Sequence, residues 1–101
     1  MEKVIRNGRV AVLVSRGFST GWYTHHGVEE LLFHPKLVEM VEECKKHNIC
    51  EWVKENFDLE VSYYGAMGIV IHWVPDGEPF MVEQINRYEY VYTAEDLDLV
   101  A

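Results

Sequence analysis

The 101-residue sequence is poor in cysteine, in proline and in positive charge. Its two cysteines, Cys44 and Cys50, lack the spacing of a zinc or redox motif, so we expect buried, reduced thiols. No apolar run approaches the roughly 20 residues that a membrane-spanning helix needs. The first residues also lack a basic segment followed by an apolar one, so we expect no secretion signal and a cytoplasmic protein.

Positive charge is scarce and unevenly placed. Nine lysines and arginines stand against 17 acids, which gives a formal net charge of -8. Extended contact with duplex DNA needs several basic side chains to neutralise phosphates, so duplex nucleic acid is not an expected partner. Residues 1–27 are the exception, because they hold four basic residues and one acid. We therefore expect one local positive site on an acidic protein.

Several motifs that carry chemistry are missing. The glycines of residues 17–27 form neither a G-x-x-x-x-G-K-S/T phosphate loop, nor a G-x-G-x-x-G fingerprint, nor a G-x-S-x-G nucleophile elbow. The adjacent His25 and His26 do not have the helical spacing of a zinc site. We expect no catalytic residues, no cofactor and no metal. A small hydrolase that uses His25 or His26 is the remaining enzymatic alternative.

The apolar pattern predicts short strands and helices. Asn7-Gly8 is a strong hairpin signal, and the continuously apolar residues 10–14 indicate a central strand covered on both faces. Pro35 suits the first turn of a helix. We expect strands over residues 3–6, 9–15, 61–64, 69–74, 80–85 and 88–92, helices over residues 29–33, 36–47 and 50–57, and a last helical turn through Leu99.

This order predicts an α+β fold. We expect a small, mostly antiparallel sheet with two central helices packed on one face, in the order β-α-α-β-β-β. The length suits one modest core, so residues 1–101 are expected to form a single domain.

Residues 16–27 combine glycines, hydroxyls, an arginine, histidines and large aromatics directly after the predicted central strand. Glycines allow positive φ, successive N–H groups in a turn hold anions, and arginine suits phosphate. In this hypothesis Arg16 pairs a phosphate, and Trp22 or Tyr23 stacks a base. The expected ligand-binding residues are Arg16, Gly17, Ser19, Thr20, Gly21, Trp22, Tyr23, His25 and His26. A tight connection in which Trp22 closes the core is the alternative, and the sequence leaves both open.

Tyrosines alternate along the last predicted strand. Tyr88, Tyr90 and Tyr92 share one face of it. They belong to the core if that face is covered, and they form an interface if it is open. The sequence does not decide between the two.

The segment that begins at Val10 and ends at Thr24 resembles one in small, mostly uncharacterised proteins of bacteriophages and prophages. The shared pattern is V-A-V-L-x-S-x-G-F-x-x-G-W, and residues 73–80, W-V-P-D-G-E-P-F, resemble those proteins as well. Ser19 and Thr20 stand here where the usual form has a small Gly-Ala pair. The resemblance implies a phage accessory protein in the cytoplasm of a bacterial host, and it fixes no activity.

Taken together, these patterns favour a phage anti-defence protein that sequesters a nucleotide-derived signalling molecule. The expected partners are a nucleotide-like small anion and further copies of the chain, with no membrane. The alternative is a protein-interaction module that inhibits a host enzyme through its acidic helices or its tyrosine-rich surface.

Overall fold

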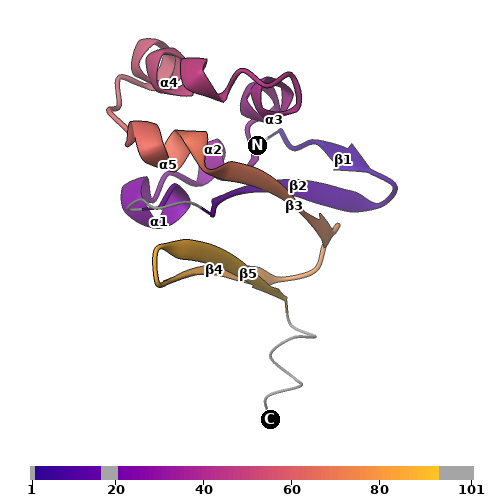
Figure 1. The fold of residues 1–101 in the computed structure, drawn as a ribbon. Coiled ribbons are helices and arrows are strands. Elements are labelled where there is room, and N and C mark those ends of the chain that lie inside the picture. The colour runs from indigo at the N-terminus through magenta and orange to yellow at the C-terminus, as the bar shows by residue number, and fades with distance from the viewer. Residues whose placement is uncertain (1, 17–20, 94–101) are drawn as a thin grey trace.

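The computed structural model describes residues 2–16 and 21–93 of the chain (Figure 1). Its elements are β1 (Ile5–Arg6), β2 (Arg9–Ser15), α1 (Tyr23–His26), α2 (Glu29–Phe33), α3 (Pro35–Glu42), the 3-10 turn η1 (Lys46–Asn48), α4 (Ile49–Phe57), α5 (Tyr63–Met67), β3 (Ile69–Pro75), β4 (Phe80–Ile85) and β5 (Tyr88–Thr93). The fold is α+β, with small antiparallel sheets and several helices, as predicted. Among the described helices, none is long and apolar enough to span a membrane.

The strands form two sheets where one was expected. The first sheet has the order β1-β2-β3, and the second is the β4-β5 hairpin. Both are antiparallel, and β2 pairs with β3 over its whole length, from Arg9 opposite Pro75 to Ser15 opposite Ile69. A bridge between Arg16 and Tyr88 links the two sheets. The chain turns sharply at Gly77, with φ +83°, so β4 leaves β3 instead of pairing beside it.

The central strand β2 is covered on both faces, as its continuous apolar run predicts. Ala11 and Leu13 pack into a cluster with α3, α4 and α5, whereas Val10, Val12 and Val14 pack with α2 and the β4-β5 hairpin. Successive side chains of a strand point to opposite faces, so one strand supplies both clusters. The result is three layers: helices α3, α4 and α5, the β1-β2-β3 sheet, and the β4-β5 hairpin beneath it (Figure 1).

The hairpin turn predicted at Asn7-Gly8 forms, and a second two-residue turn joins the strands predicted over residues 80–85 and 88–92. Asn7 and Gly8 have φ of 53° and 75°, and Asn86 and Arg87 have φ of 52° and 72°. Two successive positive φ values are typical of the type I′ turn, whose twist matches that of its strands. The first strand is shorter than predicted, since it covers only Ile5–Arg6.

The predicted helix over residues 36–47 ends early. Helix α3 stops at Glu42, because Cys44 takes a left-handed φ of 60° and the Lys45 N–H donates to Met40 O at 2.8 Å. This geometry turns Cys44 to solvent, so the expectation of a buried thiol there is wrong. Cys50 is half-buried, and its Sγ lies 3.6 Å from Val61 O.

The strand predicted over residues 61–64 is wrong as well. Ser62 caps a short helix, α5, by accepting a hydrogen bond from the Gly65 N–H at 3.2 Å. Gly65 is needed here because a Cβ would clash with the carbonyl oxygen of Gly21. The predicted helical turn through Leu99 lies outside the described residues, and Thr93 ends β5.

Candidate functional site

The segment expected to bind a ligand is described in part. Gly17, Ser19 and Thr20 lie outside the described residues. The other six expected residues are described, and of these Tyr23 lines the groove described below. Those six are Arg16, Gly21, Trp22, Tyr23, His25 and His26.

Trp22 belongs to the core, which corrects its expected role as a stacking surface. Its side chain is only 1% exposed. The indole Nε1–H donates to Leu31 O at 3.3 Å, and the His26 ring packs edge-on against it with centroids 4.7 Å apart. Neither ring face is open to a base, so the tight-connection alternative describes this residue.

A buried carboxylate lies at the base of the segment. Glu89 in β5 is 0% exposed. It accepts hydrogen bonds of 2.7 Å from the Ser15 N–H, at the end of β2, and from both the N–H and the hydroxyl of Thr24 in α1. Charge-assisted hydrogen bonds of this kind offset the cost of burying a carboxylate. Glu89 therefore connects the two segments on either side of residues 17–20, the end of β2 and the start of α1.

This arrangement bears directly on the anion hypothesis. The Ser15 and Thr24 N–H groups already donate to an internal carboxylate, so they are not available to a phosphate. The negative charge of Glu89 also opposes an anion at the same place. Sequence reasoning missed Glu89, because a strand in which tyrosines alternate with Glu89, Val91 and Thr93 does not show which face is buried.

Gly21 packs closely against Glu89 and its partner Thr24, so its missing side chain makes room for these residues. Its φ is +94°, and a Cβ there would lie 2.6 Å from Thr24 Oγ1 and 3.1 Å from Glu89 Oε2. Only glycine combines the positive φ with the absence of a side chain at this close approach. The conformational freedom predicted for this residue is present, and it is used for internal packing.

The two histidines lie in α1 and differ in their surroundings. His25 is exposed, whereas His26 is half-buried and its Nδ1 accepts from the Val28 N–H at 2.9 Å. Burial lowers the pKa of His26 to about 4, while the charge of Glu89 acts in the opposite direction. His26 is therefore neutral at pH 7 and supports the turn into α2. Among the described residues, no group of three or more His, Cys, Asp and Glu is placed to hold a metal ion.

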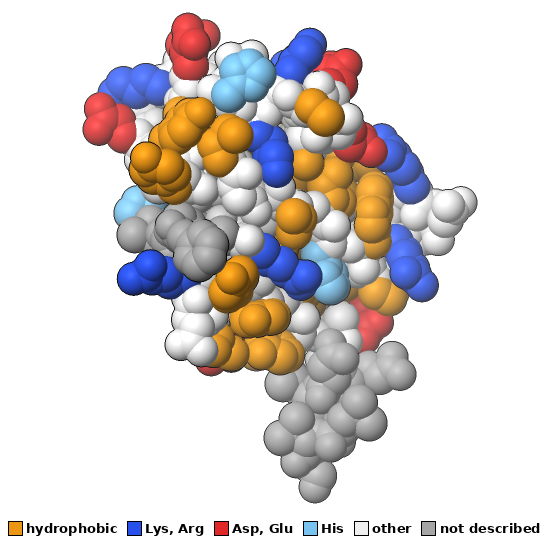
Figure 2. Space-filling model, in the orientation of Figure 1, with side chains coloured by type: hydrophobic (Ala, Val, Ile, Leu, Met, Phe, Trp, Pro, Cys, Tyr) orange, Lys and Arg blue, Asp and Glu red, His pale blue; other side chains and the backbone are white. Residues whose placement is uncertain are grey.

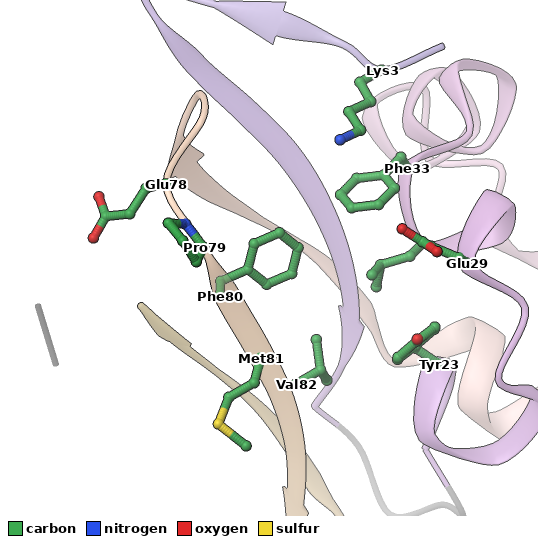
Figure 3. A pocket seen from close by; sticks show the side chains of 10 residues that line it. Lys3, Tyr23, Glu29, Phe33, Glu78, Pro79, Phe80, Met81 and Val82 are labelled. Atoms are coloured by element: carbon green, nitrogen blue, oxygen red, sulfur yellow. The ribbon is translucent and has the colours of Figure 1, made fainter. Parts of the chain in front are cut away.

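Arg16 and Tyr23 lie in different surroundings. The Arg16 guanidinium is exposed and sits 5.7 Å from the centre of the Tyr90 ring. Tyr23 instead lines a groove of about 480 Å³ between α2 and β4, together with Leu32, Phe33, Phe80 and others (Figure 3). Arg16 is not among the residues that line this groove.

The β4-β5 hairpin has one face that the described part of the chain leaves largely exposed. Cross-strand pairing places Met81 opposite Tyr92, Glu83 opposite Tyr90, and Ile85 opposite Tyr88, so these six side chains share a face. We call them the outward face. Met81, Ile85 and Tyr90 are 47%, 40% and 36% exposed, and Tyr88 and Tyr92 are half-buried. Figure 2 shows hydrophobic side chains gathered over this hairpin, with lysine and arginine side chains beside them.

Comparison with known proteins gives no guide to this site, since no family model, curated protein or solved structure matches the chain.

Proposed function

We propose that this chain is a protein-binding module whose contact surface is the outward face of β4-β5. In this proposal it is an accessory protein of a bacteriophage that acts in the cytoplasm of the bacterial host. It inhibits a host enzyme by covering part of that enzyme's surface. The phage setting rests on the resemblance of residues 10–24 and 73–80, and the choice of surface rests on the exposure of the hairpin.

One observation carries the proposal: the tyrosine-rich face of the hairpin points away from the core. Tyrosine and methionine are enriched at protein interfaces, and tyrosine suits sites where one end of the side chain is apolar and the other is wet. Here three tyrosines and two aliphatic side chains lie together, and Glu83 is the only charged residue in the set. A small protein seldom exposes such a group without a partner.

The same face also suits self-association, and in this proposal the protein forms homo-oligomers. Sedimentation velocity over a range of concentrations measures this directly. The Ile85→Lys variant is expected to remain monomeric at concentrations where the wild type associates, because a buried lysine opposes the contact.

Nucleotide binding is the second candidate, and Arg16 is the observation that favours it. Its exposed guanidinium and the Tyr90 ring form a cation–π pair that presents charge and an aromatic face together. A nucleotide has a phosphate and a base to match them. The burial of Trp22 and the occupation of the flanking N–H groups by Glu89 remove other parts of the expected site, so this candidate comes second.

Affinity purification from host lysate, followed by binding measurements with the purified partner, tests the leading proposal. Tyr90→Ser is expected to weaken binding by about tenfold or more, since buried tyrosines are frequent hot spots. Tyr64→Ser provides a matched control, because Tyr64 is 72% exposed on α5, away from the hairpin.

Equal binding by wild type, Tyr90→Ser and Ile85→Lys would contradict the proposal. Calorimetry with linear and cyclic nucleotides separates the second candidate. Heat that appears with wild type and disappears with Arg16→Ala would favour nucleotide binding.

A further inference from the structure

The β4 strand has an edge that no described strand covers. It pairs with β5 on one side only, in a sheet of two strands. In an antiparallel pair, residues alternate between those whose N–H and C=O groups face the partner and those whose groups face away. In the pair that flanks a two-residue hairpin turn, here Ile85 and Tyr88, the backbone N–H and C=O groups of each residue point toward the other strand. Because this orientation alternates along the strand, the backbone groups of Ile85, Glu83 and Met81 point toward β5. Those of Phe80 and Val82 point toward the uncovered edge.

The groove of about 480 Å³ runs along this same edge. Phe80 and Val82 point their side chains into it, and Phe33 and Tyr23 face them from the other wall (Figure 3). A second cavity of about 250 Å³ shares Phe33 and Phe80 with the first and extends toward the turn at Asp76. The backbone groups of Phe80 and Val82, which pair with no second strand among the described residues, therefore lie beside an apolar floor. This is the arrangement that receives an added strand.

The charges around the groove indicate the chemistry of its occupant. Glu29 and Glu78 line the groove, and Asp76 and Glu78 line its extension. None of these three carboxylates takes part in an ion pair among the described residues. The one cation that lines the groove, Lys3, lies over the Phe33 ring, with its Nζ 4.4 Å from the ring centre. The surroundings are acidic overall, so a basic segment is the complementary ligand.

We propose that the groove binds an extended segment of a partner protein, which adds to β4 as a third strand of the β4-β5 sheet. Alternate apolar side chains of that segment pack on Phe33 and Phe80, and lysine or arginine residues between or beside them face Glu78 and Asp76. The backbone of the segment exchanges hydrogen bonds with Phe80 and Val82. The side chains of Phe80 and Val82 lie on the face of β4 opposite the outward face, and Met81 is the one residue of the outward face that also lines the groove. The inference does not depend on the proposed function, because it rests on the free edge of β4 and not on the tyrosines.

Selection from a displayed library of random peptides against the full chain provides the ligand for the test. We expect enriched peptides to alternate apolar residues with lysine or arginine. The best peptide is then synthesised in two forms, with N-methyl groups on the amides of one edge or of the other. Methylation of the edge that faces β4 is expected to weaken binding by about tenfold, because it removes the backbone donors, whereas methylation of the other edge leaves binding unchanged.

Two charge variants test the acidic rim. Glu78→Lys is expected to weaken peptide binding and to reduce its dependence on salt. Glu51→Lys makes the same charge change on α4, at the opposite side of the molecule, and is expected to bind as the wild type does.

Four results would overturn the inference: no enriched peptide, equal loss from methylation of either edge, pairing of β4 with a second copy of the chain, or loss of binding in Tyr90→Ser. The last result would place the peptide on the outward face and would leave the proposed function standing.

Discussion

The two sheets of this molecule differ in how their faces are used. Both faces of β2 in the first sheet are closed by apolar neighbours, and the strand is buried from Val10 to Ser15. Among the described residues, apolar neighbours close only one face of the β4-β5 hairpin, and that inner face carries Gln84, Glu89 and Thr93 beside Phe80, Val82 and Val91. The more apolar face of the hairpin is the one that points to solvent.

This contrast shows that the hydrogen bonds of Glu89 to Ser15 and Thr24, and not hydrophobicity, decide which face of the hairpin is buried. We call these three residues the Glu89 junction. Glu89 has to face inward to hold the end of β2 and the start of α1. Because side chains of a strand alternate, that requirement turns Tyr88 and Tyr90 outward. Glu89 thus links a structural role on the inner face to the exposure of the outward face, which is the proposed binding surface.

The largest expected effect lies in the closed sheet. Leu13 is fully buried, so Leu13→Ala is expected to lower the free energy of unfolding by about 3 to 5 kcal/mol. Met81→Ala, on the outward face, is expected to cost less than about 0.5 kcal/mol. Urea denaturation of both variants measures the difference. Similar losses for the two would mean that the outward face is packed as tightly as the core.

Next in size is the comparison between two glutamates of the same hairpin. Glu89→Gln is expected to cost about 2 to 3 kcal/mol, because an amide cannot accept all the bonds that the carboxylate accepts. Glu83→Gln, on the exposed face, is expected to change stability by less than about 0.5 kcal/mol. Denaturant unfolding compares them. An unchanged midpoint for Glu89→Gln would contradict the role given to this carboxylate.

Much of the fold could be predicted from local signals in the sequence. Asn7-Gly8 specifies its turn because both residues tolerate positive φ, and Pro35 begins its helix as expected. The layer of β4-β5 could not be predicted, because it depends on where the chain goes after Gly77. Even with the strand pairing of β4 and β5 known, hydrophobicity alone would place the tyrosine face toward the core, because that face is the more apolar of the two.

The candidate site was harder to predict for a related reason. Glycines that permit a ligand to approach also permit the protein's own atoms to approach, as Gly21 does with Thr24 and Glu89. Composition does not distinguish the two uses. Trp22 likewise suits a core and a stacking surface equally, and only the position of Leu31 and His26 decides between them.

Two glycine variants test how much the close packing of Gly21 against Thr24 and Glu89 contributes to stability. Gly21→Ala is expected to cost about 2 kcal/mol, from its positive φ and from contact with Thr24 Oγ1. Gly27→Ala also has a positive φ, but no atom lies within 4 Å of its Cβ, so about 1 kcal/mol is expected. Thermal and denaturant unfolding measure both. Equal costs would show that crowding around Glu89 is unimportant.

The smallest expected effect comes from His26 and depends on pH. Its pKa is about 4 in the fold, against an ordinary value of 6.5, so between these values the unfolded chain binds a proton that the folded one does not. Stability is therefore complete above about pH 6.5 and falls as the pH drops toward 4. The full shift corresponds to about 3 kcal/mol, and partial exposure of the ring reduces the expected loss to about 1 kcal/mol.

His26→Gln provides the reference for that prediction, since it removes the titrating group. Urea denaturation at pH 7 and pH 4.5 is expected to show a smaller loss in the variant than in the wild type. A titration of the His26 ring followed by NMR gives the pKa directly, and a midpoint near the ordinary value would contradict the burial described here.

The central claim is that β5 turns Glu89 and Val91 inward and its tyrosines outward. Relaxation by a soluble paramagnetic chelate, measured by NMR under conditions where sedimentation shows a monomer, tests this residue by residue. The account predicts strong relaxation of the Tyr90 ring protons and weak relaxation of the Val91 methyl groups. A protected Tyr90 ring beside strongly relaxed Val91 methyl groups would reverse the two faces and contradict the account.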